Sequence, residues 1–203
     1  AADLVRQAET AMYQAKRHRH CYRLATRSRQ LTQPSPMGAH ELRQALQNDE
    51  LFLVYQPIYD SLGGKRDQIS GVEALVRWAH PIRGILAPDN FLPLAERIGL
   101  LPSLGQRVLD LALRQLALWR RSDAVQLRMA VNLAPAQLVN PQLPAQIIAA
   151  LQSNAVPADA LTLEITENAL MAHPERALES LRALRQIGVQ VAIDDFGMGY
   201  SSF

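Results

Sequence analysis

Five short apolar segments, rich in β-branched residues, alternate with helical segments over most of the chain. No other feature of the sequence constrains the fold as much. The strand-like segments are residues 51–59, 69–78, 127–133, 161–166 and 189–194. This alternation is typical of an α/β domain with a largely parallel sheet. The 203 residues include 48% hydrophobic and 20% charged side chains, the ordinary balance of a globular protein that buries a core.

Several residues mark where helices should begin and end. Residues 40–50 predict a short helix, and Ser103 is expected to cap a long helix over residues 103–121. Pro174 is expected in the first turn of the last helix, and Gly188 is expected to end that helix.

The chain before residue 39 has a different character. Apolar residues recur at helical spacing between Leu4 and Ala15, which predicts an amphipathic helix whose buried face needs a cover. The composition then turns to Ser, Thr, Gln and Pro, as in a linker. We therefore divide the chain into residues 1–27, a linker at 28–38, and a domain at 39–203.

Charge and cysteine content exclude some classes of function. The net charge is only +2, and positive charge gathers only at residues 16–23, so no nucleic acid polymer is expected as a partner. A single cysteine, Cys21, excludes an internal disulfide, and a cytoplasmic location is expected; a membrane anchor in an absent N-terminal region stays open. Solvated or capping roles are expected for His40, His80 and His173.

Four of the strand-like segments carry a candidate oxygen ligand. These residues are Glu73, Asn132, Glu164 and Asp194. An ion pair with Arg77 would be another explanation for Glu73, but four residues of strand separate their backbones by about 13 Å. If the strands are parallel neighbours, their C-terminal ends meet at the edge where α/β sheets carry active sites.

This set of side chains suits a metal site. Clustered carboxylates in a dry site repel one another, and a divalent cation relieves the repulsion. Ligation by oxygen alone favours Mg²⁺ or Mn²⁺ over zinc, while Ca²⁺ is chemically allowed. The pair Asp194 and Asp195 fits a two-metal arrangement for in-line phosphoryl displacement. A helix or loop cap is the alternative role for Asp195.

Several motifs resemble, in order, the signatures of EAL domains, the phosphodiesterases of the bacterial second messenger cyclic di-GMP. They are YQP at 55–57, EALVRW at 73–78, NL at 132–133, EITENAL at 164–170 and DDFGMGYSSF at 194–203. The resemblance runs from about residue 39 to the end. Residues 6–17, RQAETAMYQAKR, are similar to the last helix of a GGDEF (diguanylate cyclase) domain, so residues 1–27 resemble its C-terminal remnant.

The resemblance implies a TIM-type (β/α) barrel with one antiparallel strand. It implies an enzyme that binds two Mg²⁺ or Mn²⁺ ions and hydrolyses cyclic di-GMP to linear pGpG. The alternative is a catalytically inactive cyclic di-GMP receptor or signalling module, and the complete set of visible acids favours the enzyme. Upstream GGDEF and sensory domains are implied for a longer parent chain, and a homodimer is left open.

Carried over residue by residue, the resemblance assigns roles at nine positions. It implies metal ligands at Glu73, Asn132, Glu164, Asp194 and Asp195. Glu167 matches a further acid that orders the loop after the aspartate pair. Substrate contacts are implied at Gln56, Leu75 and Arg77.

Two positions depart from the family pattern, and the barrel is expected to be incomplete. Met198 stands where threonine is usual, and Ala134 where serine is common; neither change removes a ligand. A barrel of this type needs eight βα units, whereas five strands are predicted before Phe203. The family's later lysine, aspartate and glutamate would lie beyond that residue. We therefore expect this fragment to be inactive and poorly soluble or loosely packed, with residues 189–194 at an unpaired edge.

Overall fold

The computed structural model describes residues 37–59, 69–122 and 126–194. The chain divides into two compact units, Ala1–Pro36 and Met37–Phe203, and every described residue belongs to the second. The expected N-terminal helix and most of the expected linker lie outside the described residues, as do Asp195 and Met198. The division into three segments therefore stays a prediction.

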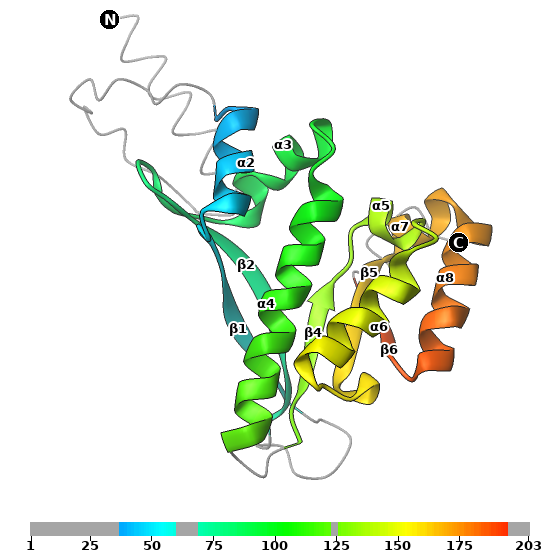
Figure 1. The fold of residues 1–203 in the computed structure, drawn as a ribbon. Helices are drawn as coiled ribbons and strands as arrows, with labels where there is room; N and C mark the ends of the chain where they lie inside the picture. Colours follow the sequence, from blue (N-terminus) through cyan, green and yellow to red (C-terminus); the bar gives the residue numbers. More distant parts are fainter. Residues whose placement is uncertain (1–36, 60–68, 123–125, 195–203) are drawn as a thin grey trace, which may run out of the picture. The chain divides into compact units, whose positions relative to one another are not determined.

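A single twisted sheet forms the centre of the second unit (Figure 1). Its strands are β1 (Leu51–Tyr59), β2 (Ile69–His80), β3 (Gly84–Leu86), β4 (Arg128–Asn132), β5 (Leu161–Thr166) and β6 (Gln190–Asp194). The strand order is β1-β2-β4-β5-β6, and β3 pairs with β2 outside this path. β1 runs antiparallel to β2, whereas β2, β4, β5 and β6 are mutually parallel. All five expected strands form, and one of them is antiparallel as expected.

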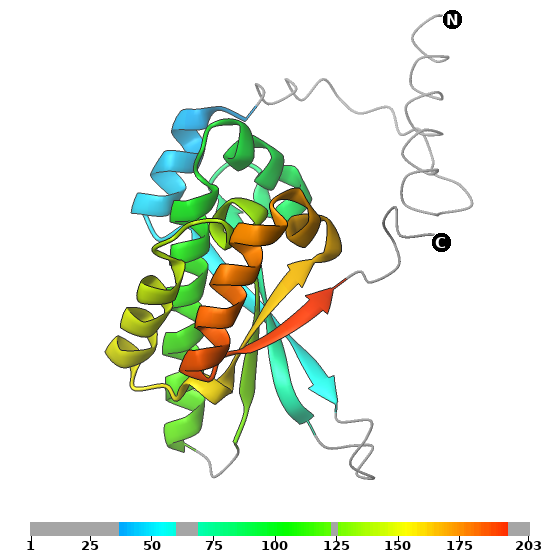
Figure 2. The same cartoon turned by 90° about the vertical axis from the view of Figure 1, so that its right-hand side faces the viewer.

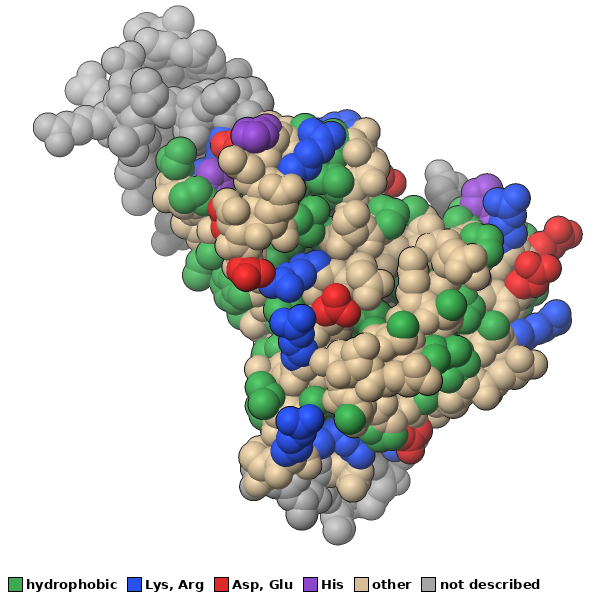
Figure 3. Space-filling view, in the orientation of Figure 1, with side chains coloured by type: hydrophobic (Ala, Val, Ile, Leu, Met, Phe, Trp, Pro, Cys, Tyr) green, Lys and Arg blue, Asp and Glu red, His purple; other side chains and the backbone are tan. Residues whose placement is uncertain are grey.

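Helices cover one face of this sheet, and no described helix covers the other, which we call the open face (Figure 2). They are α2 (Ala39–Gln47), α3 (Leu92–Arg97), α4 (Leu101–Ser122), α5 (Pro135–Leu138), α6 (Leu143–Asn154), α7 (Glu167–Ala172) and α8 (Pro174–Ile187), with 3₁₀ turns η1 (Pro88–Asn90) and η2 (Ala158–Ala160). On the side of the helices seen in Figure 3, acidic and basic side chains are interspersed rather than separated by sign. None of the helices in the described part has the length and apolar character needed to cross a membrane.

The core lies between the sheet and the helices. Along β2 the side chains of Val72, Ala74, Val76 and Trp78 are buried, while those between them are partly exposed on the open face. The ring of Trp78 meets Phe91 edge to face, with centroids 5.8 Å apart. Trp78 is thus a fully buried anchor of the core. Trp119 is only half-buried on α4, where it packs against Tyr55 at 4.7 Å.

Most helix boundaries agree with the sequence, and one prediction is wrong. α8 begins at Pro174 and ends before Gly188, which adopts a φ of 96°. Ser103, in contrast, does not cap α4, because that helix already begins at Leu101. The cause is Pro102, whose fixed φ suits the first turn of a helix and which donates no backbone hydrogen bond there.

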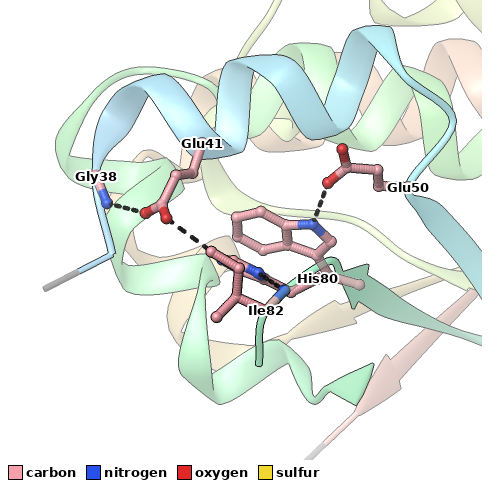
Figure 4. A network of polar contacts seen from close by, with 6 residues as sticks. Gly38, Glu41, Glu50, His80 and Ile82 are labelled. Carbon is pink, nitrogen blue, oxygen red and sulfur yellow. Dashed lines mark hydrogen bonds and ion pairs between the residues drawn. The ribbon is translucent and has the colours of Figure 1, made fainter. Parts of the chain in front are cut away.

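The expectation of a solvated or capping role for His80 is also wrong, because this residue is 4% exposed. Its ring lies 4.8 Å from that of Trp78, and Nδ1 accepts a hydrogen bond from the backbone N–H of Ile82 at 3.2 Å. Figure 4 shows Nε2 facing Glu41 of α2, whose Oε1 is 3.5 Å away. His80 continues the buried alternation of β2, so its burial follows from its position in the strand.

Candidate active site

The open face of the sheet carries the predicted ligand residues. The register pairs Asn132 with Glu164, and Thr166 with Asp194. Glu73 pairs with Ala130, two residues before Asn132 and therefore on the same face. Four neighbouring parallel strands thus bring Glu73, Asn132, Glu164 and Asp194 to one face, as the sequence predicted.

Two of these side chains are in direct contact. The Nδ2 group of Asn132 donates a hydrogen bond to Oε1 of Glu73 at 2.8 Å. Among the described residues Glu73 forms no ion pair with Arg77, whose Nη1 donates instead to the carbonyl of Val76 at 2.8 Å. The ion-pair explanation for Glu73 is therefore excluded within this part of the chain.

The carboxylates also interact electrostatically. Burial raises the pKa of Glu164 from 4.5 to about 7, with further contributions from the charges of Glu73 and Asp194. A negative charge on a neighbour disfavours ionisation of a second carboxyl group. Three acids from three strands are therefore close enough for their negative charges to repel one another.

The donor set fits a hard divalent cation in its chemistry. Carboxylate oxygens and an amide oxygen are the ligands that Mg²⁺ and Mn²⁺ prefer. Within the described ranges no three carboxylate, imidazole or thiol groups are close enough to hold one ion, and Asp195 lies outside those ranges. The amide of Asn132 currently points its nitrogen at Glu73, so metal ligation requires this side chain to turn its oxygen toward the cation.

The residues expected to contact substrate flank Glu73. Gln56 on β1 is the register partner of Glu73, and its side chain is exposed. Leu75 and Arg77 follow Glu73 at alternate positions of β2, so they share its face and are partly exposed. No ion pair joins Arg77 to a carboxylate in the described part of the chain, so its guanidinium can accept an anionic group there.

Glu167 is placed close to the ligand set by the fold. It is the first residue of α7, directly after Thr166, the register partner of Asp194. The loop that Glu167 is predicted to order begins at residue 195, outside the described residues. That role therefore stays a prediction.

Thr166 itself was not singled out from the sequence. Its Oγ1 accepts a hydrogen bond from the backbone N–H of Ala169 at 3.3 Å and so caps α7. A threonine followed by an acid and a helical segment is a recognisable signal for the start of a helix. This cap fixes the direction in which the chain leaves β5.

The fold and the site define a class: a (β/α) barrel-type domain with an acidic cluster on the carboxyl side of parallel strands. Residues 39–203 match the family model described as the EAL domain. The chain belongs to the EAL domain family.

Relatives of known name agree with this assignment. The chain is 38% identical over 203 residues to the bifunctional diguanylate cyclase/cyclic di-GMP phosphodiesterase MucR of Pseudomonas aeruginosa, covering 98% of this chain and 29% of MucR. It is 43% identical over 162 residues to the cyclic di-GMP phosphodiesterase NbdA of the same organism, covering 80% of this chain and 20% of NbdA. The chain thus spans less than a third of the length of these relatives.

A solved structure gives the same picture of the fold. The PaMucR phosphodiesterase in complex with c-di-GMP superposes with a TM-score of 0.73 at 42% sequence identity. The matched region covers 80% of this chain and 65% of that chain.

Proposed function

We propose that this domain takes part in the hydrolysis of cyclic di-GMP to linear pGpG, assisted by two divalent cations. The observation that carries the proposal is the strand register that brings Glu73, Asn132, Glu164 and Asp194 to one face, and the raised pKa of Glu164 agrees with it. Family membership and the names of the relatives support the choice of substrate. A cluster of carboxylates that resists full ionisation is what a cation site presents before the cation binds.

The ligand role belongs to Glu73, Asn132, Glu164, Asp194 and Asp195. When bound, Mg²⁺ or Mn²⁺ lowers the pKa of a water molecule and offsets the negative charge that develops on the phosphate. In the metal-free site, the raised pKa of Glu164 leaves its carboxyl group partly protonated near pH 7. This proton must leave for the carboxylate to act as a ligand, so binding releases it to solvent.

The substrate is held by residues beside the ligands. Arg77 presents a planar guanidinium that can donate two parallel hydrogen bonds to a phosphate. Gln56 adds an amide that can donate or accept, and Leu75 adds apolar surface between the two polar groups. The three side chains share the face of Glu73, so they can orient a phosphodiester over the acidic cluster.

The most direct test replaces Glu73 with glutamine. The variant is made in a protein whose wild-type form hydrolyses cyclic di-GMP. Glu73→Gln keeps the size of the side chain and an acceptor for Asn132 but removes one negative charge from the ligand set. We expect turnover to fall by about a hundredfold or more, because the cation loses an anionic ligand. Release of pGpG, separated by chromatography with Mg²⁺ or Mn²⁺ present, is the measurement.

Glu179→Gln is the matched control, because it removes one carboxylate from the exposed surface of α8. Turnover by Glu73→Gln within twofold of the control would sink the metal assignment. Tight binding of cyclic di-GMP by the wild type without any pGpG would instead favour the receptor alternative.

A further inference from the structure

Gln137 holds the backbone just beyond the predicted ligand Asn132. It lies in α5, the short helix that follows β4, and its Oε1 accepts a hydrogen bond from the backbone N–H of Ala134 at 3.2 Å. Ala134 is only two residues after Asn132. It carries no side-chain oxygen with which to cap α5, and the contact from Gln137 is the other half of a capping box, in which the side chain at the third helical position accepts from the N–H of the N-cap residue.

A glycine on another helix makes room for this side chain. Gly105 lies in the first turns of α4, and a Cβ added there would overlap the Oε1, Nε2 and Cδ atoms of Gln137. Glycine within a helix is less favourable than alanine. The close approach of the Gln137 amide gives a physical reason for glycine at this position.

Two further contacts fix the same segment. The backbone N–H of Leu133 donates to the carbonyl of Glu164 at 2.8 Å, which ties the end of β4 to β5. Leu138, the last residue of α5, is completely buried. The segment from Leu133 to Leu138 is thus anchored at both ends. Between them the Gln137 amide adds a side-chain contact to the backbone hydrogen bonds that the N–H groups of Gln137 and Leu138 donate to the Ala134 carbonyl.

We propose that Gln137, seated in the space left by Gly105, is a positioning residue for Asn132. The Gln137–Ala134 hydrogen bond sets the backbone path after β4, and this path sets where the Asn132 amide reaches Glu73. The ligand role of Asn132 rests on the proposed function. The positioning itself concerns the Asn132–Glu73 contact and can be tested with no metal present.

Three variants separate this role from general stability. Gln137→Leu keeps a similar volume but removes the acceptor, and Gly105→Ala displaces Gln137 without touching it chemically. Gln137→Glu keeps an acceptor oxygen close to a helix N-terminus, where a negative charge is favourable. We expect the first two variants to behave alike, their combination to be no worse than either alone, and Gln137→Glu to resemble wild type.

The first measurement is the side-chain amide signal of Asn132 in nitrogen-15 spectra of the metal-free protein. In wild type it should report the hydrogen bond to Glu73, and in Gln137→Leu and Gly105→Ala it should shift or broaden. The second measurement is Mn²⁺ affinity by calorimetry, expected to weaken on the order of tenfold in the same two variants, as is usual when a partner that orients a ligand is lost.

Two controls keep the test decisive. Ser103→Ala alters an exposed position of α4 close to Gly105, and Ile147→Val loosens the core under α6. If Gln137→Leu and Gly105→Ala lower the melting temperature as Ile147→Val does but leave the Asn132 signal unchanged, positioning is refuted. If wild type binds no Mn²⁺, the proposed function fails, while the Asn132 signal still decides the role of Gln137.

Discussion

Glu164 combines partial burial with two charged neighbours, and this combination gives the site its sensitivity to pH. Its folded pKa of about 7 exceeds the ordinary value of 4.5, so the folded chain binds the proton more tightly than the unfolded chain. Stability linked to this group is therefore present at low pH and is lost as the pH rises from 4.5 toward 7.

The first prediction at this scale is that Glu164→Gln flattens the pH dependence of stability. The melting temperature of the metal-free wild type should fall between pH 5 and pH 8 relative to that of Glu164→Gln, because only the wild type must ionise a crowded carboxyl group. Thermal melts in chelator at several pH values measure this difference. Parallel curves for the two proteins would show that neither burial nor the charges of Glu73 and Asp194 raise the pKa of Glu164.

A second prediction concerns Arg77. Arg77→Ala should weaken the binding of cyclic di-GMP by about tenfold or more while leaving Mn²⁺ affinity within about twofold, because the guanidinium pairs with phosphate and not with the ligand set. Arg77→Lys should recover only part of the loss. Two calorimetric titrations measure these affinities. The titration with cyclic di-GMP uses Ca²⁺ in place of Mg²⁺, and a separate titration with Mn²⁺ gives the metal affinity. Unchanged substrate affinity in Arg77→Ala would refute the role.

At the scale of elements, the sequence predicted the strands with a repeating apolar pattern and missed the shortest strand and helix. The strands of the sheet could be found because apolar alternation persists over five residues or more. Four of the predicted ligands, Glu73, Asn132, Glu164 and Asp194, lie on such strands. β3 has three residues and α5 has four, too few for any period to appear. The Gln137–Gly105 contact joins positions 32 residues apart, which no local pattern records.

The end of α6 offers a prediction about helix termination. Ala155 follows this helix with a φ of 53°, a left-handed conformation that glycine adopts without strain. Ala155→Gly should therefore stabilise the fold by about 0.5–1 kcal/mol, the reverse of the usual cost of glycine. Urea denaturation measures the change. Ala149→Gly, in the exposed middle of the same helix, is the control and should destabilise by a similar amount.

At the scale of the whole molecule, the sheet ends on both sides without a further partner among the described strands. Along the main path β1 pairs only with β2, and β6 pairs only with β5. Ile193 on β6 is 47% exposed. Unpaired edges with apolar side chains favour association between molecules.

We therefore predict that the 203-residue chain self-associates through its edges. Ile193→Lys should raise the monomer fraction, measured by light scattering after gel filtration, because a charge on an edge strand opposes pairing. Leu118→Lys is the control, since Leu118 is 58% exposed on the helix α4 rather than on an edge strand. Equal monomer fractions in the two variants would exclude β6 as the associating edge.

Because β1 is antiparallel, the chain before it enters the sheet at the end where the parallel strands finish. We call the two ends of the sheet along the strands its poles. Leu51, the first residue of β1, pairs with Trp78 near the C-terminal end of β2, beyond Glu73. In a barrel whose strands were all parallel, the first strand would begin at the pole opposite the carboxyl ends. Here α2 leads into β1 at the pole toward which the parallel strands point. Two contacts fix this connection: Glu41 lies against His80, and Glu50 accepts a hydrogen bond from the ring N–H of Trp78 (Figure 4). A mechanical pull or twist on α2 would therefore act directly at the pole that carries the predicted ligand residues, and not through the length of the sheet.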